Sequence, residues 1–270
     1  MQVVRAAMVG DVVGASGLEA LEAQLPALIK ERNLDFITVN GENAAEGFGM
    51  TAGDFQRIIA AGADVVTSGN HIWEKREFWT VLNNEKKMLR PANYPGSVSG
   101  AGAPAGAPGA GSVCIEKNGV FWTVINLQGR EYMSAIDCPF QCLDRILTGQ
   151  AEGQKPSVII VDFHAESSRE KEALGYYADG RVSLIAGTHT HVQTADERIL
   201  PKGSAYITDL GMTGIHDSVI GMDPKICLDR ALKQVMFHME TADAHKPGKL
   251  QGVIAEIDIE TGMAVGIWRV

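Results

Sequence analysis

The sequence predicts an α/β/β/α sandwich in which two mixed β-sheets are flanked by helices. Apolar runs typical of buried strands alternate with helical patterns through the first half of the chain, which is the order expected of βαβ units. More strand-like runs follow in the second half, and the last two flank the turn-like Glu260-Thr261-Gly262, as in an antiparallel hairpin. Two sheets would accommodate this many strands.

The segment before residue 70 is expected to fold as β-α-β-α-β. Ser16 and Glu19 have the spacing of a capping box at the start of one helical pattern, and Thr51 and Asp54 open a second helix. In chain order, the expected elements are a strand over 3–9, a helix with Leu18, Leu21, Leu25 and Leu28 at helical spacing, a strand over 36–39, a helix with Phe55, Ile58 and Ile59, and a strand that begins at Val65.

The rest of the chain is expected to add strands around one Gly/Ala/Pro-rich loop. Residues 95–112 are almost entirely Gly, Ala, Pro and Ser, which cannot bury a core, so we expect a mobile loop there. This loop is not a strong domain boundary and the chain has no internal repeat, so we predict one domain over 1–270. The remaining strands are expected at 113–115, 120–127, 158–161, 182–186, 205–208, 253–259 and 264–270.

The composition is that of a globular protein that does not coat nucleic acid. Of the 270 residues, 45% are hydrophobic and 21% charged, near the averages for soluble domains, and the formal charge of −9 argues against a stable nucleic-acid complex. No apolar stretch approaches the roughly 20 residues that span a bilayer, and the N-terminus has no signal-peptide pattern. The four cysteines form no CxxC pair, as expected of reduced thiols. These features predict a cytoplasmic protein without a membrane segment.

Side chains of the types that bind metal ions follow five of the predicted strands. Ligands bind at the carboxyl ends of strands in open α/β sheets, so these side chains could converge although they are far apart in the chain. One such residue alone is more often a turn or a helix cap, but two histidines two residues apart in an extended segment face the same way and can address one metal. The residues concerned are Asp11, then Glu42 and Asn43, then Asn70 and His71, then Asp162 and His164, and finally His189 and His191.

The order and spelling of these motifs resemble the calcineurin-like metallophosphoesterase superfamily, and within it the bacterial YmdB-type phosphodiesterases. The resemblance covers nearly the whole chain. It depends on Gly10-Asp11-Val12-Val13-Gly14, Asn40-Gly41-Glu42-Asn43-Ala44-Ala45, Gly69-Asn70-His71, Arg90-Pro91-Ala92-Asn93, Asn126-Leu127-Gln128-Gly129-Arg130 and residues 187–196. Two departures from the broad superfamily, Val13 where a histidine is usual and Glu42 where an aspartate is usual, are features of the YmdB-type family.

The resemblance implies a site for two metal ions, with iron expected and manganese as a substitute. The first ion would be held by Asp11, Glu42, Asn43 and His191, and the second by Glu42, Asn70, His164 and His189, so that Glu42 bridges the two. Oxygen and imidazole ligands suit these metals, and no thiolate is present to favour a closed zinc site. His71 would donate a proton to the leaving group.

The function expected of this site is hydrolysis of small cyclic nucleotides, with 2′,3′-cyclic phosphates favoured by the resemblance. Two metals about 3.5–4 Å apart can share a bridging hydroxide that attacks phosphorus. Two divalent metal ions would carry four positive charges, which two carboxylates, one hydroxide and one phosphodiester anion would offset. Two alternatives stay open: a phosphomonoesterase or phosphoprotein phosphatase with the same metals, and a regulatory protein that binds metal and nucleotide. The resemblance also implies a homo-oligomer.

Several other polar residues have weaker expected roles. Four carboxylates could orient the ligand imidazoles, and no particular one is favoured over the others. They are Asp162, Glu166, Asp196 and Asp209. His216 could contact substrate but fits an exposed loop better, and His238 and His245 are expected to be solvated.

Overall fold

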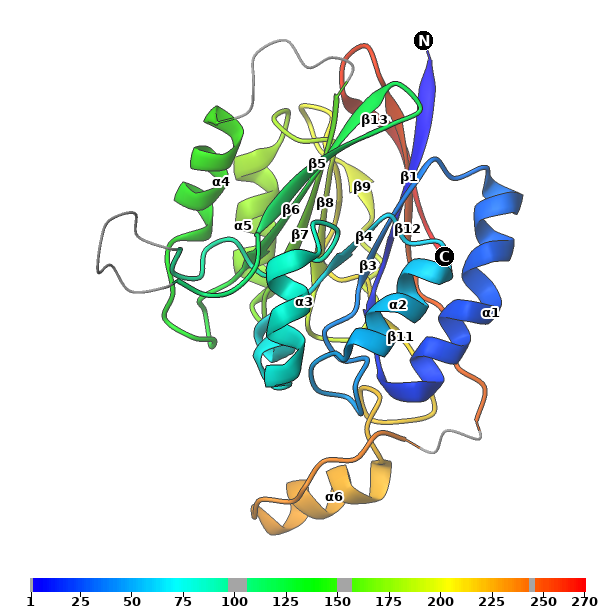
Figure 1. The fold of residues 1–270 in the computed structure, drawn as a ribbon, viewed down its shortest axis with the longest axis vertical. Helices are drawn as coiled ribbons and strands as arrows, with labels where there is room; N and C mark the ends of the chain where they lie inside the picture. Colours follow the sequence, from blue (N-terminus) through cyan, green and yellow to red (C-terminus); the bar gives the residue numbers. More distant parts are fainter. Residues whose placement is uncertain (1, 97–105, 150–156, 243–245) are drawn as a thin grey trace.

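The computed structural model describes residues 2–96, 106–149, 157–242 and 246–270, and within them two large sheets face each other with helices outside (Figure 1). The α/β/β/α architecture predicted from the sequence is therefore confirmed. The first sheet has the strand order β13-β12-β1-β3-β4, and the second has the order β5-β6-β7-β8-β10-β9. A third pairing joins only the short β2 and β11.

The strands follow the predicted pattern closely. Those of the first sheet are β1 (Val3–Val9), β3 (Phe36–Asn40), β4 (Val65–Thr67), β12 (Gly252–Asp258) and β13 (Met263–Arg269). Those of the second are β5 (Ser112–Lys117), β6 (Val120–Gln128), β7 (Ser157–His164), β8 (Leu184–Thr188), β9 (Arg198–Ile199) and β10 (Ala205–Ile207). The small pair is β2 (Asp11–Val12) and β11 (Met212–Thr213).

Both large sheets are mixed, with a parallel centre. β1, β3 and β4 run parallel, and the terminal hairpin of β12 and β13 joins them antiparallel, as expected. In the second sheet β6, β7, β8 and β10 are parallel, while β5 and β9 are antiparallel edge strands. The loops that carry the predicted ligands follow these parallel strands.

The helices are longer and more numerous than the sequence patterns predicted. The sequence indicated α1 (Gly14–Arg32) and α2 (Ala52–Ala60). It did not indicate α3 (Trp79–Asn84), α4 (Pro139–Thr148), α5 (Ser168–Ala178), α6 (Pro224–Lys233) or the short 3-10 turns η1 (Asn70–Trp73) and η2 (Arg76–Phe78). No helix in the described ranges combines the length and the apolar composition that a membrane span needs.

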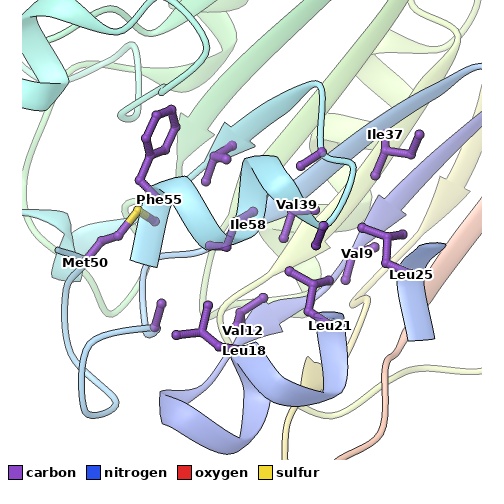
Figure 2. Close-up of a cluster of buried hydrophobic side chains, with 14 of the residues drawn as sticks. Val9, Val12, Leu18, Leu21, Leu25, Ile37, Val39, Met50, Phe55 and Ile58 are labelled. Atoms are coloured by element: carbon purple, nitrogen blue, oxygen red, sulfur yellow. The ribbon is translucent and has the colours of Figure 1, made fainter. Parts of the chain in front are cut away.

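Three apolar layers hold the sheets and helices together. Leu18, Leu21 and Leu25 of α1 are at most 2% exposed and pack on the first sheet beside α2 (Figure 2). A second layer lies between the sheets, where the rings of Phe36 and Trp122 stack with centroids 4.7 Å apart. The third lies between the second sheet and its helices. Burial of a large apolar side chain contributes about 1.5–3 kcal/mol, so these layers fix the two sheets relative to each other.

One of the two predicted helix starts is wrong. α2 begins as expected, because Thr51 Oγ1 accepts from Asp54 N at 3.2 Å and Asp54 Oδ2 accepts from Thr51 N at 3.0 Å. Ser16, in contrast, lies inside the first turn of α1, and the residue that precedes the helix is Val13, whose side chain makes no capping bond. Backbone partners fix this turn instead, because Val13 N donates to Thr213 O at 3.0 Å.

Two other boundaries differ from the prediction. The strand expected at 182–186 is β8, which begins at Leu184 and continues to Thr188, because Val182 pairs with Asp179 in a turn. This shift places Thr188 directly before the predicted ligand histidines. Half of the Gly/Ala/Pro-rich loop, residues 97–105, lies outside the described residues. Its end is fixed at Ala110, which pairs with Leu89, and Ser112 already belongs to β5.

Candidate metal centre

The predicted ligands come from the carboxyl ends of strands in both sheets. Asp11 begins β2 just beyond β1, Glu42 and Asn43 follow β3, and Asn70 opens the turn after β4. His164 is the last residue of β7, and His189 and His191 follow β8. The structure brings Asp11, Glu42, Asn70, His164, His189 and His191 close together where the two sheets meet, and Asn43 lines the same cavity as Glu42, His189 and His191.

The first set surrounds the imidazole of His164, which is fully buried. Its Nε2 lies 2.9 Å from Glu42 Oε1, 3.1 Å from Asn70 Oδ1 and 3.0 Å from His189 Nδ1. Ligand atoms of Glu42, His164 and His189 all lie within 4.8 Å of one another. These four residues form one compact group of oxygen and nitrogen donors that could hold a cation.

The second set shares Glu42 and adds Asp11, Asn43 and His191. Asp11 Oδ1 lies 3.8 Å from His191 Nε2, and Asp11 Oδ2 accepts a 3.3 Å hydrogen bond from the His189 backbone N–H. Two oxygens in this set, Asp11 Oδ1 and Asn43 Oδ1, are buried and make no hydrogen bond, and Glu42 Oε1 has only the His164 imidazole beside it, at 2.9 Å. A buried polar atom without a partner costs about 1–3 kcal/mol, and a cation would satisfy Asp11 Oδ1 and Asn43 Oδ1. The donor set therefore fits a metal ion.

Each imidazole of the three predicted ligand histidines is held through one ring nitrogen, so the other nitrogen is available to bind a metal ion. His164 Nδ1 lies 2.9 Å from Thr188 Oγ1, and His191 Nδ1 donates to Ile220 O at 2.9 Å. His189 Nε2 lies 3.1 Å from Glu166 Oε2, which leaves Nδ1 directed at His164. Such outer contacts fix tautomer and ring orientation at metal sites.

Two of the four candidate carboxylates support the site through threonines. Asp162 is buried among Thr67, Thr188 and the amide of Asn40, and it reaches His164 only through Thr188, whose hydroxyl donates to Asp162 Oδ1 at 2.7 Å. Asp209 accepts from Thr190 N at 3.2 Å and from Thr190 Oγ1 at 2.7 Å. Glu166 contacts His189 directly, whereas Asp196 bonds to Thr208 and to no ligand.

A buried ion pair lies beneath the loop of ligand histidines. Lys171 of α5 is 2% exposed, and its Nζ donates to Asp209 Oδ2 at 2.7 Å. The loop itself is strained, because His189 and His191 have φ values of 100° and 62°, in the region that side chains other than glycine rarely adopt. The contacts of Asp209 with Thr190 hold the loop at its midpoint. The sequence patterns did not indicate Lys171, since a lysine in a polar helix gives no signal of burial.

Close packing around His164 also explains a glycine in the Gly-Asn-His motif. A Cβ atom on Gly69 would lie 2.1 Å from His164 Cδ2, so only glycine lets the chain pass the imidazole ring. The same turn then places Asn70 Oδ1 beside His164 Nε2.

The charges of the buried groups are strongly coupled. Burial raises the pKa of Asp11 to about 6. Burial also acts to raise the pKa of Glu42, but the charge of His164 outweighs it and lowers that pKa to about 2. Burial opposes protonation of His164, yet Glu42 raises its pKa to about 9, and burial together with His164 lowers the pKa of His189 to about 3. A cation bound here would compete with the proton that Glu42 favours on His164.

His71 lies beside the predicted ligands. Its backbone N–H donates to Glu42 Oε2 at 3.0 Å, while its ring packs edge-on against Phe48 with centroids 5.0 Å apart. The side chain is 27% exposed, and Nδ1, 3.6 Å from Glu74 Oε1, makes no hydrogen bond. The imidazole can therefore reach a ligand in the adjoining cavity.

A cavity of about 350 Å³ opens directly onto this site. Its lining joins the metal loops to the segment around α6, and it comprises Glu42, Asn43, Phe48, His71, Glu166, His189, Thr190, His191, Ile220, Met222, Arg230 and Met239. The sequence patterns did not indicate Phe48 or Arg230. His216 is exposed, as expected, and lines a neighbouring cavity of about 260 Å³ that shares His191 and Ile220. His238 is exposed, and His245 lies outside the described residues.

Comparison with known proteins identifies the family. The sequence model of the family described as YmdB-like protein matches residues 7–270. This chain belongs to the YmdB-like family. It is 41% identical over 266 residues to the 2′,3′-cyclic-nucleotide 2′-phosphodiesterase of Bacillus subtilis, and the match covers 98% of this chain and 96% of that protein.

Solved structures agree with this assignment. A phosphatase from Mycoplasma pneumoniae is 33% identical to this YmdB-like chain with a TM-score of 0.89, covering 100% of this chain and 93% of that one. The NAD nucleotidase of Haemophilus influenzae shares the fold alone, at 11% identity and a TM-score of 0.61, with 99% of this chain and 55% of that one covered. This YmdB-like protein is a phosphoric ester hydrolase with a metallophosphoesterase fold.

Proposed function

We propose that this YmdB-like protein is a two-metal phosphodiesterase that hydrolyses small cyclic nucleotides, with 2′,3′-cyclic phosphates as preferred substrates. The observation that carries the proposal is the pair of buried oxygens without hydrogen bonds, Asp11 Oδ1 and Asn43 Oδ1, beside the cluster of Glu42, His164 and His189. The name of the Bacillus subtilis relative supports the choice of substrate. The proposed domain extends over 1–270, and a cytoplasmic location stays a prediction.

The metal-binding residues that we propose are those predicted from the sequence. Asp11, Glu42, Asn43 and His191 would hold one ion, and Glu42, Asn70, His164 and His189 the other. Oxygen and imidazole donors without thiolate favour iron or manganese. When bound, two such ions activate water and neutralise phosphate charge.

His71 is proposed as the proton donor to the leaving oxygen. Three observations support this role: its backbone N–H is fixed on Glu42, its ring lies against Phe48, and its side chain lines the cavity at the proposed metal centre. The backbone bond positions the imidazole beside the metal ligands without using a ring nitrogen. A positioned acid of this kind typically contributes 10²–10⁴-fold to the rate.

The experiment that tests the function compares a chromogenic phosphodiester with the matching monoester. Faster diester turnover is expected from the balance of charges. Two divalent ions supply four positive charges, and Asp11, Glu42 and a hydroxide offset three of them, so a substrate with one negative charge completes the balance. The phosphatase name of the Mycoplasma pneumoniae structure favours a monoesterase as the second candidate, and faster monoester turnover would select it. A regulatory protein without catalysis would hydrolyse neither compound.

A homo-oligomer is part of the proposal, and α6 supports it. Leu228 and Leu232 lie about one turn apart on α6 and are 58% and 72% exposed, and Val235 and Met236, just beyond the end of the helix, are 52% and 85% exposed. An exposed apolar stripe on a short helix is a typical contact surface between subunits. Replacing Leu228 and Leu232 with glutamate should lower the mass measured by sedimentation. An unchanged mass would exclude this stripe as the contact.

A further inference from the structure

The segment that carries α6 projects from the body of the protein. Residues 220–242, called here the α6 arm, leave the small strand pair and return before β12, and Figure 1 shows α6 standing away from both sheets. α6 itself has no buried residue. Its two ends pair with each other at the base, where Met222 is 4% exposed and pairs with Thr241, and where Asp223 N donates to Glu240 O at 2.9 Å.

The base of the arm rests on two loops that carry proposed ligands. Ile220 O accepts the Nδ1 hydrogen bond of His191. On the other side, Met222 packs against Gly47, where an added Cβ would lie 2.9 Å from Met222 Cε. Gly47 O in turn accepts from Asn43 Nδ2 at 2.8 Å. The arm is therefore fixed relative to the metal centre although α6 is exposed.

Arg230 of the arm is the one lysine or arginine among the residues that line the 350 Å³ cavity. The acidic groups in that lining are Glu42 and Glu166. Within the described ranges, the Arg230 guanidinium makes no ion pair or hydrogen bond, whereas Lys233 of the same helix pairs with Asp229 at 3.0 Å. A cationic side chain that faces a cavity without a partner is available to an anionic ligand.

The position of Arg230 on the helix separates it from the apolar stripe. At 100° per residue, Arg230 lies about 200° from Leu228 and 200° from Leu232, on the opposite face. That face is turned toward the cavity, since Arg230 lines it and Leu228 and Leu232 do not. The stripe can therefore contact another surface while Arg230 contacts a ligand.

We propose that Arg230 binds the phosphate of the substrate, and so sets the affinity of this site for anionic phosphodiesters. The proposal depends on the function proposed above. A planar guanidinium with a fork of N–H donors matches two phosphate oxygens, which a lysine ammonium cannot do. Arg230 lies on an arm rather than on a strand end, so its contribution is to binding and not to the arrangement of the ligands.

The test measures KM and kcat with 2′,3′-cyclic AMP for the wild type, Arg230→Gln, Arg230→Lys and the control Lys225→Gln. Lys225 is an exposed cation of the same helix that does not line the cavity. Loss of a hydrogen-bonded charge contact corresponds to roughly a 10- to 100-fold change in affinity. We expect Arg230→Gln to raise KM by that factor and to keep kcat within about threefold of the wild type. Arg230→Lys should recover part of the lost affinity. Lys225→Gln should have the KM and kcat of the wild type.

Inorganic phosphate provides a second readout. Its inhibition constant should rise in Arg230→Gln by a similar factor and stay unchanged in Lys225→Gln. The role of Arg230 would be overturned if KM and the inhibition constant were unchanged in Arg230→Gln, or if Lys225→Gln changed them equally. Either result would leave the proposed function intact, because the wild type would still hydrolyse the diester. Absence of diester turnover in the wild type would instead refute the proposed function, and phosphate binding measured by calorimetry would still test Arg230.

Discussion

Replacement of Asp209 by asparagine should weaken metal binding, although Asp209 is not a proposed ligand. The carboxylate is 1% exposed at its side chain and pairs with buried Lys171 at 2.7 Å, and it holds Thr190 between two ligand histidines with positive φ values. Asparagine leaves the ammonium of Lys171 buried without a counterion. Breaking a buried pair in this way costs about 3–5 kcal/mol.

Two quantities should change in Asp209→Asn. At roughly 2–4 °C per kcal/mol for a domain of this size, Tm should fall by about 10 °C. The outer support of the histidine loop would also be lost, and loss of such support typically lowers metal affinity 10–100-fold. The affinity is measured by calorimetric titration of the metal-free protein with Mn²⁺, at a temperature where both proteins are folded.

Asp179→Asn is the matched control for this prediction. Asp179 is 4% exposed and accepts backbone hydrogen bonds from Lys202 at 2.9 Å and Ser204 at 3.2 Å, with no contact to a ligand loop. It should lower Tm and leave Mn²⁺ affinity unchanged. The reasoning is refuted if Asp209→Asn binds Mn²⁺ as tightly as the wild type, or if Asp179→Asn loses as much affinity.

Three further outcomes are expected. His71→Ala should retain both metals in elemental analysis and lose diesterase activity by about a hundredfold or more; normal turnover would exclude it as the proton donor. His189→Ala should lower the metal content, since His189 Nδ1 lies 3.0 Å from His164 Nε2, and full occupancy would remove it from the ligand set. Leu21→Ala should reduce the free energy of unfolding by about 2–5 kcal/mol in urea titration, because Leu21 is fully buried between α1 and the first sheet, and a loss below 1 kcal/mol would contradict that packing.

The strands could be predicted because their apolar runs are continuous, and the helices of the second half could not. β6 is buried almost throughout, and six of its nine residues are apolar, all but Thr123, Asn126 and Gln128. The leucines of α6, Leu228 and Leu232, are exposed and do not face a core, and α5 combines many charged residues with a buried Lys171, so neither helix shows a clear division into a buried apolar face and an exposed polar face. The start of α1 was missed because tertiary backbone contacts of Val13, not a capping side chain, determine it.

The places of the proposed ligands at the ends of strands could be predicted from the sequence, and their surroundings could not. Glu42 and His189 belong to motifs that end recognisable strands, so parallel topology alone brings them to one edge. Lys171 and Arg230 reach the site from helices whose position depends on packing far from them in sequence. The role of Lys171 is inferred from its burial, and the role of Arg230 is inferred from its place in the lining of the cavity.

The most direct test of the two-metal phosphodiesterase is a titration of the metal-free protein with Mn²⁺, in which turnover of 2′,3′-cyclic AMP is measured at each ratio of metal to chain. The two overlapping ligand sets that share Glu42 predict that activity rises mainly with the second equivalent and reaches a plateau at two. Full activity at one equivalent, or no activity at two, would contradict the proposed site.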